Sequence, residues 1–106
     1  MQPETESIWI GLLEVSPYKN AEVLRDASGA FVNVVTWASS EVQFREKAKV
    51  VMDELKLAIM GVENAEPVAN RGVLEDQDLA DIVSRVENNR KAIIYSTFHT
   101  WSERPN

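Results

Sequence analysis

Three segments of this chain have the composition of β-strands, yet each is apolar on both sides. They span residues 8–15, 31–37 and 92–101 and are rich in β-branched and aromatic residues. In the last segment, Ile93 and Trp101 project to one side of a strand, and Ile94 and Phe98 project to the other. A sheet with one wet face would alternate apolar with polar residues. We therefore expect a sheet whose two faces both need a cover.

Two other segments have the apolar periodicity of amphipathic helices. Residues 40–57 repeat apolar side chains at helical spacing, and Ser40 and Gln43 have the spacing of a capping box at the start. Residues 76–88 repeat apolar side chains at i, i+3, i+4 and i+7. A weaker strand, residues 58–63, lies between the two helices. The predicted order is therefore ββαβαβ.

Each predicted helix lies between two strands, which favours two crossover connections with both helices on the same face. The expected fold class is α/β, and more closely an α+β two-layer sandwich. It would have a four-stranded mixed sheet with two helices on one face, broadly ferredoxin-like in architecture though not in strand order. The helix-free face would then need another cover. The candidates are the connection at residues 16–29, a second copy of the chain, a different protein or a flat ligand.

Length and composition favour one soluble domain. A chain of 106 residues has room for a single core, so we expect one domain over residues 1–106, with flexible ends at 1–6 and 103–106. No uncharged apolar stretch reaches the ~18 residues that a membrane span needs. Residues 1–7 carry two acids and no base, unlike the start of a signal peptide. We therefore expect a cytoplasmic protein without a membrane partner, and the absence of cysteine is compatible with that location.

The net charge of −6 is concentrated in one part of the sequence. From Glu63 to Asp81 there are six acids and one base, whereas the other bases are scattered along the chain. A nucleic-acid surface needs clustered Lys and Arg, so we expect no nucleic-acid partner. The acidic stretch could dock a basic protein, as a toxin-neutralising immunity protein would. The alternative, which we favour, is that it only keeps the protein soluble.

Candidate chemistry is restricted by a single histidine, His99, and by the lack of cysteine. These exclude disulfides, thiol nucleophiles and metal sites built from His or Cys. An enzyme could use His99 as a general base, oriented by Glu14 or by a loop acid. The competing interpretation, a surface or interfacial histidine, is the one we favour. The acids around Asp78 lack the glycine and the final glutamate of a calcium loop, and no glycine falls in a phosphate-binding frame, so we expect no metal and no cofactor.

The sequence therefore favours a small interaction module that binds instead of catalysing. We expect it to form a homodimer through the helix-free sheet face, since two-fold dimers dominate among oligomers. The alternatives are an accessory or regulatory domain that holds a small apolar or aromatic ligand between Trp37, Tyr95 and Trp101, an immunity-like protein, and an enzyme based on His99. The interface or ligand candidates are Asn33, Trp37, Tyr95, His99 and Trp101.

Overall fold

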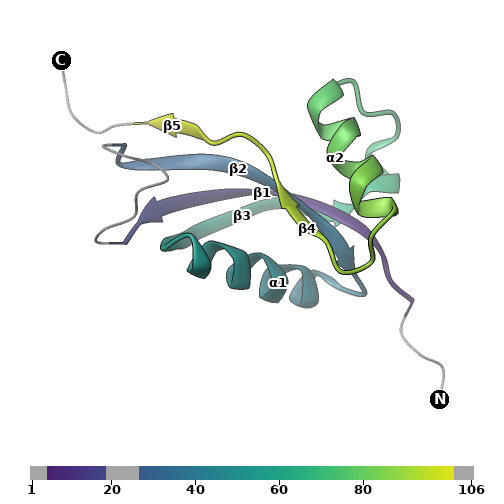
Figure 1. Ribbon diagram of the computed structural model, residues 1–106, viewed down its shortest axis with the longest axis horizontal. Coiled ribbons are helices and arrows are strands. Elements are labelled where there is room, and N and C mark those ends of the chain that lie inside the picture. Colours follow the sequence, from purple (N-terminus) through teal and green to yellow (C-terminus); the bar gives the residue numbers. More distant parts are fainter. Residues whose placement is uncertain (1–4, 19–26, 102–106) are drawn as a thin grey trace.

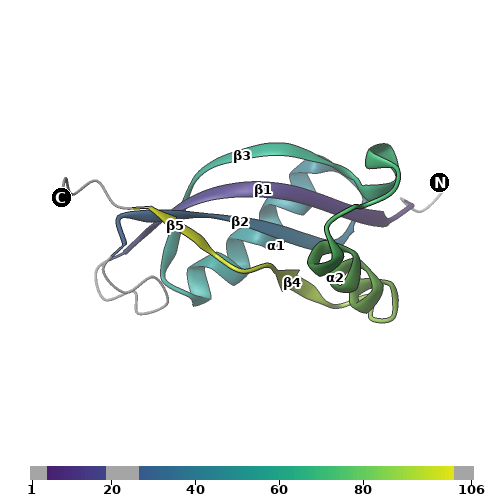
Figure 2. The ribbon, with the colours of Figure 1, turned by 90° about the horizontal axis from the view of Figure 1, so that it is seen from above.

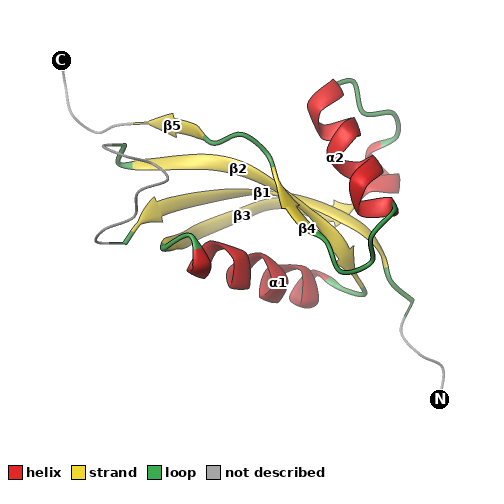
Figure 3. Ribbon diagram, in the orientation of Figure 1, coloured by secondary structure: helices red, strands yellow, loops and turns green. Residues whose placement is uncertain are grey.

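The strand-forming segments build one antiparallel sheet, on which two α-helices pack (Figure 1). The computed structural model describes residues 5–18 and 27–101. Within that part of the chain the fold is α+β, with five strands, two α-helices and one short 3-10 helix (Figure 3). The elements in chain order are β1 (Ser7–Pro17), β2 (Gly29–Ala38), α1 (Glu41–Glu54), β3 (Leu57–Pro67), η1 (Val68–Arg71), α2 (Gln77–Glu87), β4 (Ile93–Tyr95) and β5 (His99–Trp101).

The two longest strands, β1 and β2, form the centre of the sheet. Their antiparallel register is regular, with Ile10 opposite Val35 and Leu13 opposite Val32. β3 pairs with the outer side of β1, while β4 and β5 pair one after the other with the outer side of β2. Each strand pairing among the described residues is antiparallel.

Helix α1 covers one face of this sheet. Its buried residues Phe44, Ala48 and Met52 join a cluster of strand residues that includes Leu13 and Val32. Ser40 is the helix N-cap, and its Oγ accepts a hydrogen bond from the backbone N of Gln43 at 3.1 Å. The Gln43 side chain accepts from the backbone N of Ser39, one residue earlier than in an ideal capping box. The predicted helix start is therefore confirmed.

Helix α2 covers the opposite face, at one end of the sheet. Its buried residues Ile82, Val83 and Val86 pack against Ile10 and Val35, which alternate with the residues under α1. Figure 1 shows the two helices on opposite sides of the sheet, and Figure 2, seen from above, shows α2 in front of one end only. Part of the second apolar face of the sheet is therefore covered by α2, a helix of the same chain.

The sheet differs from the predicted four-stranded mixed sheet with both helices on one face. β3 lies beyond β1 instead of beside β2, so α1 crosses β1 on one face. From the outer edge at β3, the chain returns through η1 and α2 over the other face to reach β4, which is antiparallel to β2. A helix that connects strands at opposite edges can pack on either face. Here the apolar stripe of α2 is buried on the face that α1 leaves uncovered.

The last predicted strand, residues 92–101, is split into β4 and β5. Between them, Ser96 keeps Asn33 hydrogen-bonded through both its side chain and its backbone. The Asn33 backbone N donates to Ser96 Oγ at 3.0 Å, and the Ser96 backbone N donates to the Asn33 carbonyl at 2.9 Å. The serine hydroxyl thus takes the place of one backbone acceptor where the ladder is interrupted. This local replacement accounts for five strands where four were expected.

Three predictions concern segments at or near the limits of the description. Residues 1–4 and 103–106, expected to be flexible, and most of the 16–29 connection lie outside the described residues. Glu6, which was also expected to be flexible, is held in place by ion pairs with Lys47 at 3.7 Å and with Arg90 at 3.3 Å.

Among the described helices, none has the length and apolar character to cross a membrane.

Candidate functional site

A cleft of about 510 Å³ lies between α2 and the segment that runs from β4 to β5. Three apolar side chains, Leu79, Ile82 and Ile94, take part in its lining together with a larger set of polar ones. From α2 and its N-cap these are Asp76, Asp78, Asp81 and Arg85, and from β2 and the β4–β5 segment they are Asn33, Tyr95, Ser96, Thr97 and His99. We call this feature the α2 cleft. It joins part of the acidic stretch and three of the predicted interface residues, Asn33, Tyr95 and His99, in one place.

The start of α2 determines which side chains face the cleft. The Asp76 carboxylate caps the helix by accepting hydrogen bonds from the backbone N atoms of Asp78 at 2.9 Å and Leu79 at 3.2 Å. From that start, Asp78, Asp81 and Arg85 follow at i, i+3 and i+7, which places them along one side of the helix. Because they lie beside Leu79 and Ile82, their charged groups are at the edge of the apolar stripe that α2 packs against the sheet.

The charged groups of the cleft are poorly neutralised by one another. Asp81 accepts a hydrogen bond from Gln77 Nε2 at 2.9 Å. Among the described residues, the side chains of Asp78, Arg85 and His99 form no hydrogen bond or ion pair with the protein. Three carboxylates therefore share the cleft with one guanidinium and one imidazole, so its field is negative at neutral pH.

His99 and Glu14 share a sheet face but do not form a catalytic pair. Phe31 on β2 lies opposite Glu14 on one side and opposite His99 on the other. The aromatic residue therefore stands between the carboxylate and the imidazole, and the structure has no hydrogen bond between them. A base oriented by Glu14 is not assembled here. The acids that share a cleft with His99 come from α2.

Beyond α2, the same sheet face continues as a surface with an apolar centre. The register places Leu12 opposite Asn33, Glu14 opposite Phe31 and Gly29 opposite Trp101, on the side of the sheet that α2 occupies further along. No described helix or strand packs over this part (Figure 2). Leu12 and Phe31 are only partly buried. We call the set Leu12, Glu14, Phe31, Asn33, His99 and Trp101 the open half-face.

Trp101 is fixed at the end of the open half-face by the absence of a side chain at Gly29. A Cβ atom at Gly29 would lie 2.5 Å from the Trp101 ring, so the indole rests directly on the glycine backbone. Among the described residues, the buried Trp101 Nε1 has no hydrogen-bond partner.

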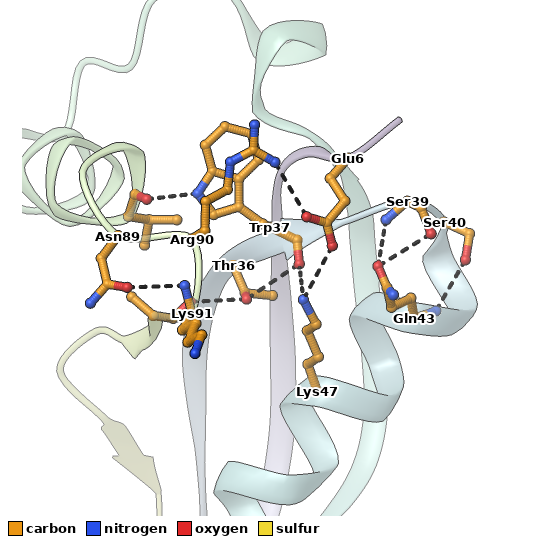
Figure 4. A network of polar contacts seen from close by, with 12 residues as sticks. Glu6, Thr36, Trp37, Ser39, Ser40, Gln43, Lys47, Asn89, Arg90 and Lys91 are labelled. Atoms are coloured by element: carbon orange, nitrogen blue, oxygen red, sulfur yellow. Dashed lines mark hydrogen bonds and ion pairs between the residues drawn. The ribbon is translucent and has the colours of Figure 1, made fainter. Parts of the chain in front are cut away.

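Trp37 lies at the other end of this face and has a structural role. Its Nε1 donates to the Val86 carbonyl at 2.7 Å, and the Arg90 guanidinium stacks 3.9 Å from the ring centroid. Lys47 Nζ donates to the Trp37 carbonyl at 2.6 Å, and Glu6 links Lys47 with Arg90 (Figure 4). This network ties α1, β2 and the end of α2 together. A second hollow, of about 440 Å³, adjoins Trp37.

Tyr95 is separate from both tryptophans. It lies opposite Val34, in the register of the α1 face, and its ring is 5.5 Å from that of Phe98. Trp37, Tyr95 and Trp101 therefore occupy three different places and do not line one ligand pocket. The sequence did not identify Ser96, Thr97 and the α2 acids as neighbours of His99. The pair of small polar residues inside an apolar strand pattern was the available signal for the break.

The described residues contain no group of three or more His, Asp or Glu side chains arranged to hold a metal ion. Comparisons with protein-family models, with curated proteins and with solved structures gave no match to this chain. A functional assignment therefore depends on the geometry of the α2 cleft and the open half-face.

Proposed function

We propose that this protein is a small interaction module that binds another polypeptide through the open half-face. The observation that carries the proposal is the incomplete cover of the second sheet face, where α2 buries Ile10 and Val35 but leaves Leu12 and Phe31 partly exposed. Removing apolar surface from water is worth about 25 cal/mol per Å². A chain that lies on this part of the sheet would gain that free energy where α2 does not.

The edges of the sheet are less suited to binding than its face. β3 pairs irregularly with β1, with register shifts at two points, and Asn64 within it has a φ of 54°. On the other side, β4 and β5 have three residues each. Bulges and short edge strands are the usual means by which proteins prevent strand addition. A binding partner would therefore meet the open half-face.

A second copy of this chain is the occupant that the sequence favours. In a two-fold dimer each half-face meets its equal, so Phe31 and Leu12 of one copy would lie near the same residues of the other. This apolar pair is the specific observation that supports a homodimer.

The other interpretations have weaker support. An enzyme that relies on His99 and Glu14 is disfavoured by the intervening Phe31, and one small ligand cannot contact Trp37, Tyr95 and Trp101 together. An immunity-like protein is one kind of interaction module, so it falls within the proposal. Cytoplasmic location also belongs to the proposal and rests on the composition of the chain alone.

Size-exclusion chromatography with light scattering, at several concentrations, tests the half-face. For a dimer, we expect Phe31→Thr to raise the dissociation constant at least about tenfold, because it removes the central aromatic contact. Val50→Thr is the matched control, since Val50 is 57% exposed on α1. If Phe31→Thr leaves the dimer intact, the interface lies elsewhere, and the proposal that the open half-face forms it is refuted. A monomer at all concentrations would exclude the second copy and leave a different chain as the partner.

A further inference from the structure

The open half-face and the α2 cleft form one continuous surface. Asn33 and His99 belong to both, because the register places them on the half-face and they also line the cleft. A polypeptide that lies on Leu12 and Phe31 therefore passes directly along the charged side of α2. The chemistry of that side then selects the partner.

Resting on the proposed function, we infer that the occupant is an extended, basic segment of a different protein. Carboxylates border the apolar centre on two sides. Asp78 and Asp81 lie on the α2 side, while Glu14 is on the half-face and Glu63 lies opposite Leu12 on β3. Against these acids stands the single guanidinium of Arg85. Basic side chains would find partners on both sides of an apolar centre.

Most of the described basic side chains are engaged away from this surface. Five of the described basic side chains form ion pairs elsewhere: Arg45, Lys47, Lys49, Arg71 and Arg90. Most of these pairs involve α1 or the Trp37 end of the sheet. Among the residues that the structure describes, Arg85 is the one Lys or Arg that lines the α2 cleft, beside three carboxylates.

An extended segment fits the shape and the polar groups better than a helix or a flat molecule. In an extended chain every second side chain points to the same side, so apolar ones can lie on Leu12 and Phe31 while basic ones further along that side reach the carboxylates. Among the described residues the Asn33 carboxamide forms no hydrogen bond within the protein, so it can donate to and accept from a bound backbone. Thr97, which also lines the cleft, offers a hydroxyl as a further polar group.

Charge also favours a basic partner over a second copy of this chain. Each copy carries a net charge of −6. A two-fold contact through the half-face would bring the acidic sides of two cleft regions toward each other, and like charges oppose such an encounter. A basic partner is instead attracted, with association rates raised by one to three orders of magnitude and lowered again by salt. The second copy remains as an outcome of the test.

The test uses two synthetic probes on the full chain, followed by amide chemical shifts in NMR. One is the capped peptide Arg-Gly-Leu-Gly-Leu-Gly-Arg, whose Leu and Arg side chains lie on one side of an extended chain with Arg at both ends, and the other replaces each Arg with Glu. We expect saturable shifts from the basic peptide at Leu12, Asn33 and His99, and none from the acidic one. Raising the salt from about 50 to about 300 mM should weaken binding severalfold.

A charge-matched pair of variants locates the attraction. Asp78→Asn with Asp81→Asn should weaken the basic peptide about fivefold or more, as expected for the loss of two exposed ion pairs. Glu46→Gln with Glu54→Gln makes the same change in net charge on exposed positions of α1 and should leave the affinity unchanged. Equal weakening by both pairs would mean that only the overall charge matters, and the inference would be overturned.

The remaining outcomes separate the inference from the proposed function. If both peptides bind equally, the contact is apolar, so the basic partner is wrong while the interaction module stands. If neither binds and the chain forms a dimer sensitive to Phe31→Thr, the second copy is the occupant and only the inference fails. If neither binds and the chain is monomeric, both the inference and the proposed function fail.

Discussion

Gly11 shows how a single missing side chain sets the distance between α1 and the sheet. A Cβ atom there would lie 2.8 Å and 2.9 Å from two carbons of the Phe44 ring, which is fully buried in the core. The ring also stacks against Trp9, with centroids 6.3 Å apart, so it has little freedom to move aside. The glycine inside a strand therefore marks a close approach, as strand glycines often do.

Gly11→Ala should lower the free energy of unfolding by about 1–3 kcal/mol, because the added methyl overpacks the core. Gly61→Ala is the matched control. It is a strand glycine with no atom within 4 Å of the added Cβ, and its unfolding free energy should stay within about 0.5 kcal/mol of the wild type. Urea denaturation of both variants measures the difference. Equal stability of the two would show that Phe44 relaxes freely and would contradict this account.

Individual residues show where sequence reasoning succeeded and where it could not. Ser40 was identifiable because capping depends on its neighbours in the chain, and the Ser40–Gln43 contact confirms it. Trp37 was assigned to an interface, yet its indole bonds to Val86, 49 residues away. That partner could be known only once α2 had been placed on the same face. Local chemistry was predictable, and long-range partners were not.

At the scale of elements, α1 depends on its cap. Ser40→Ala removes the acceptor for the Gln43 backbone N and should cost about 1 kcal/mol of stability. Ser84→Ala, in the exposed interior of α2, makes the same chemical change without a cap and should be neutral or slightly stabilising, because alanine has the higher helix propensity. Thermal or urea unfolding compares the two. A loss in Ser84→Ala that equals the loss in Ser40→Ala would refute the role of the cap.

The elements themselves were largely predictable, whereas their arrangement was not. Periodicity over residues 40–57 and 76–88 corresponds to α1 and α2, and the first two strands extend only slightly beyond their predicted ranges. These are local patterns. The position of β3 beyond β1 depends on pairing between distant segments. The apolar stripe of α2 fits either face, so the sequence predicted the need for a second cover but did not identify α2 as part of it.

At the scale of the whole molecule, the two covers of the sheet are unequal. Counted over residues 5–18 and 27–101, the cluster on the α1 side holds ten buried residues, whereas the cluster that includes α2 holds five. Ile82 and Val83 in the smaller cluster also keep some exposure, while Phe44 and Met52 of α1 have none. Regions with fewer buried apolar contacts open at lower free energy than the rest of a protein. The α2 cleft is therefore built on the less stable layer, where a partner could adjust it.

Glu6 connects this less stable layer to the rest of the fold. Its carboxylate pairs with Lys47 of α1 and with Arg90 just after α2, so it links the covers of opposite sheet faces (Figure 4). Arg90 in turn stacks on Trp37, whose Nε1 holds the last turn of α2. The pairs are partly exposed, which limits their contribution and makes it sensitive to salt.

Native-state hydrogen exchange followed by mass spectrometry should therefore report two openings. We expect amides of α2 to exchange through a partial opening whose free energy is at least about 1 kcal/mol below that of β1 and β2. Glu6→Gln should lower the free energy of the α2 opening by up to about 1 kcal/mol at low salt and by less at high salt. Glu46→Gln, an equal change of charge at an exposed position on α1, should leave it unchanged. If α2 exchanged only together with β1 and β2, the molecule would unfold as one unit, and the cleft would be as rigid as the core beneath it.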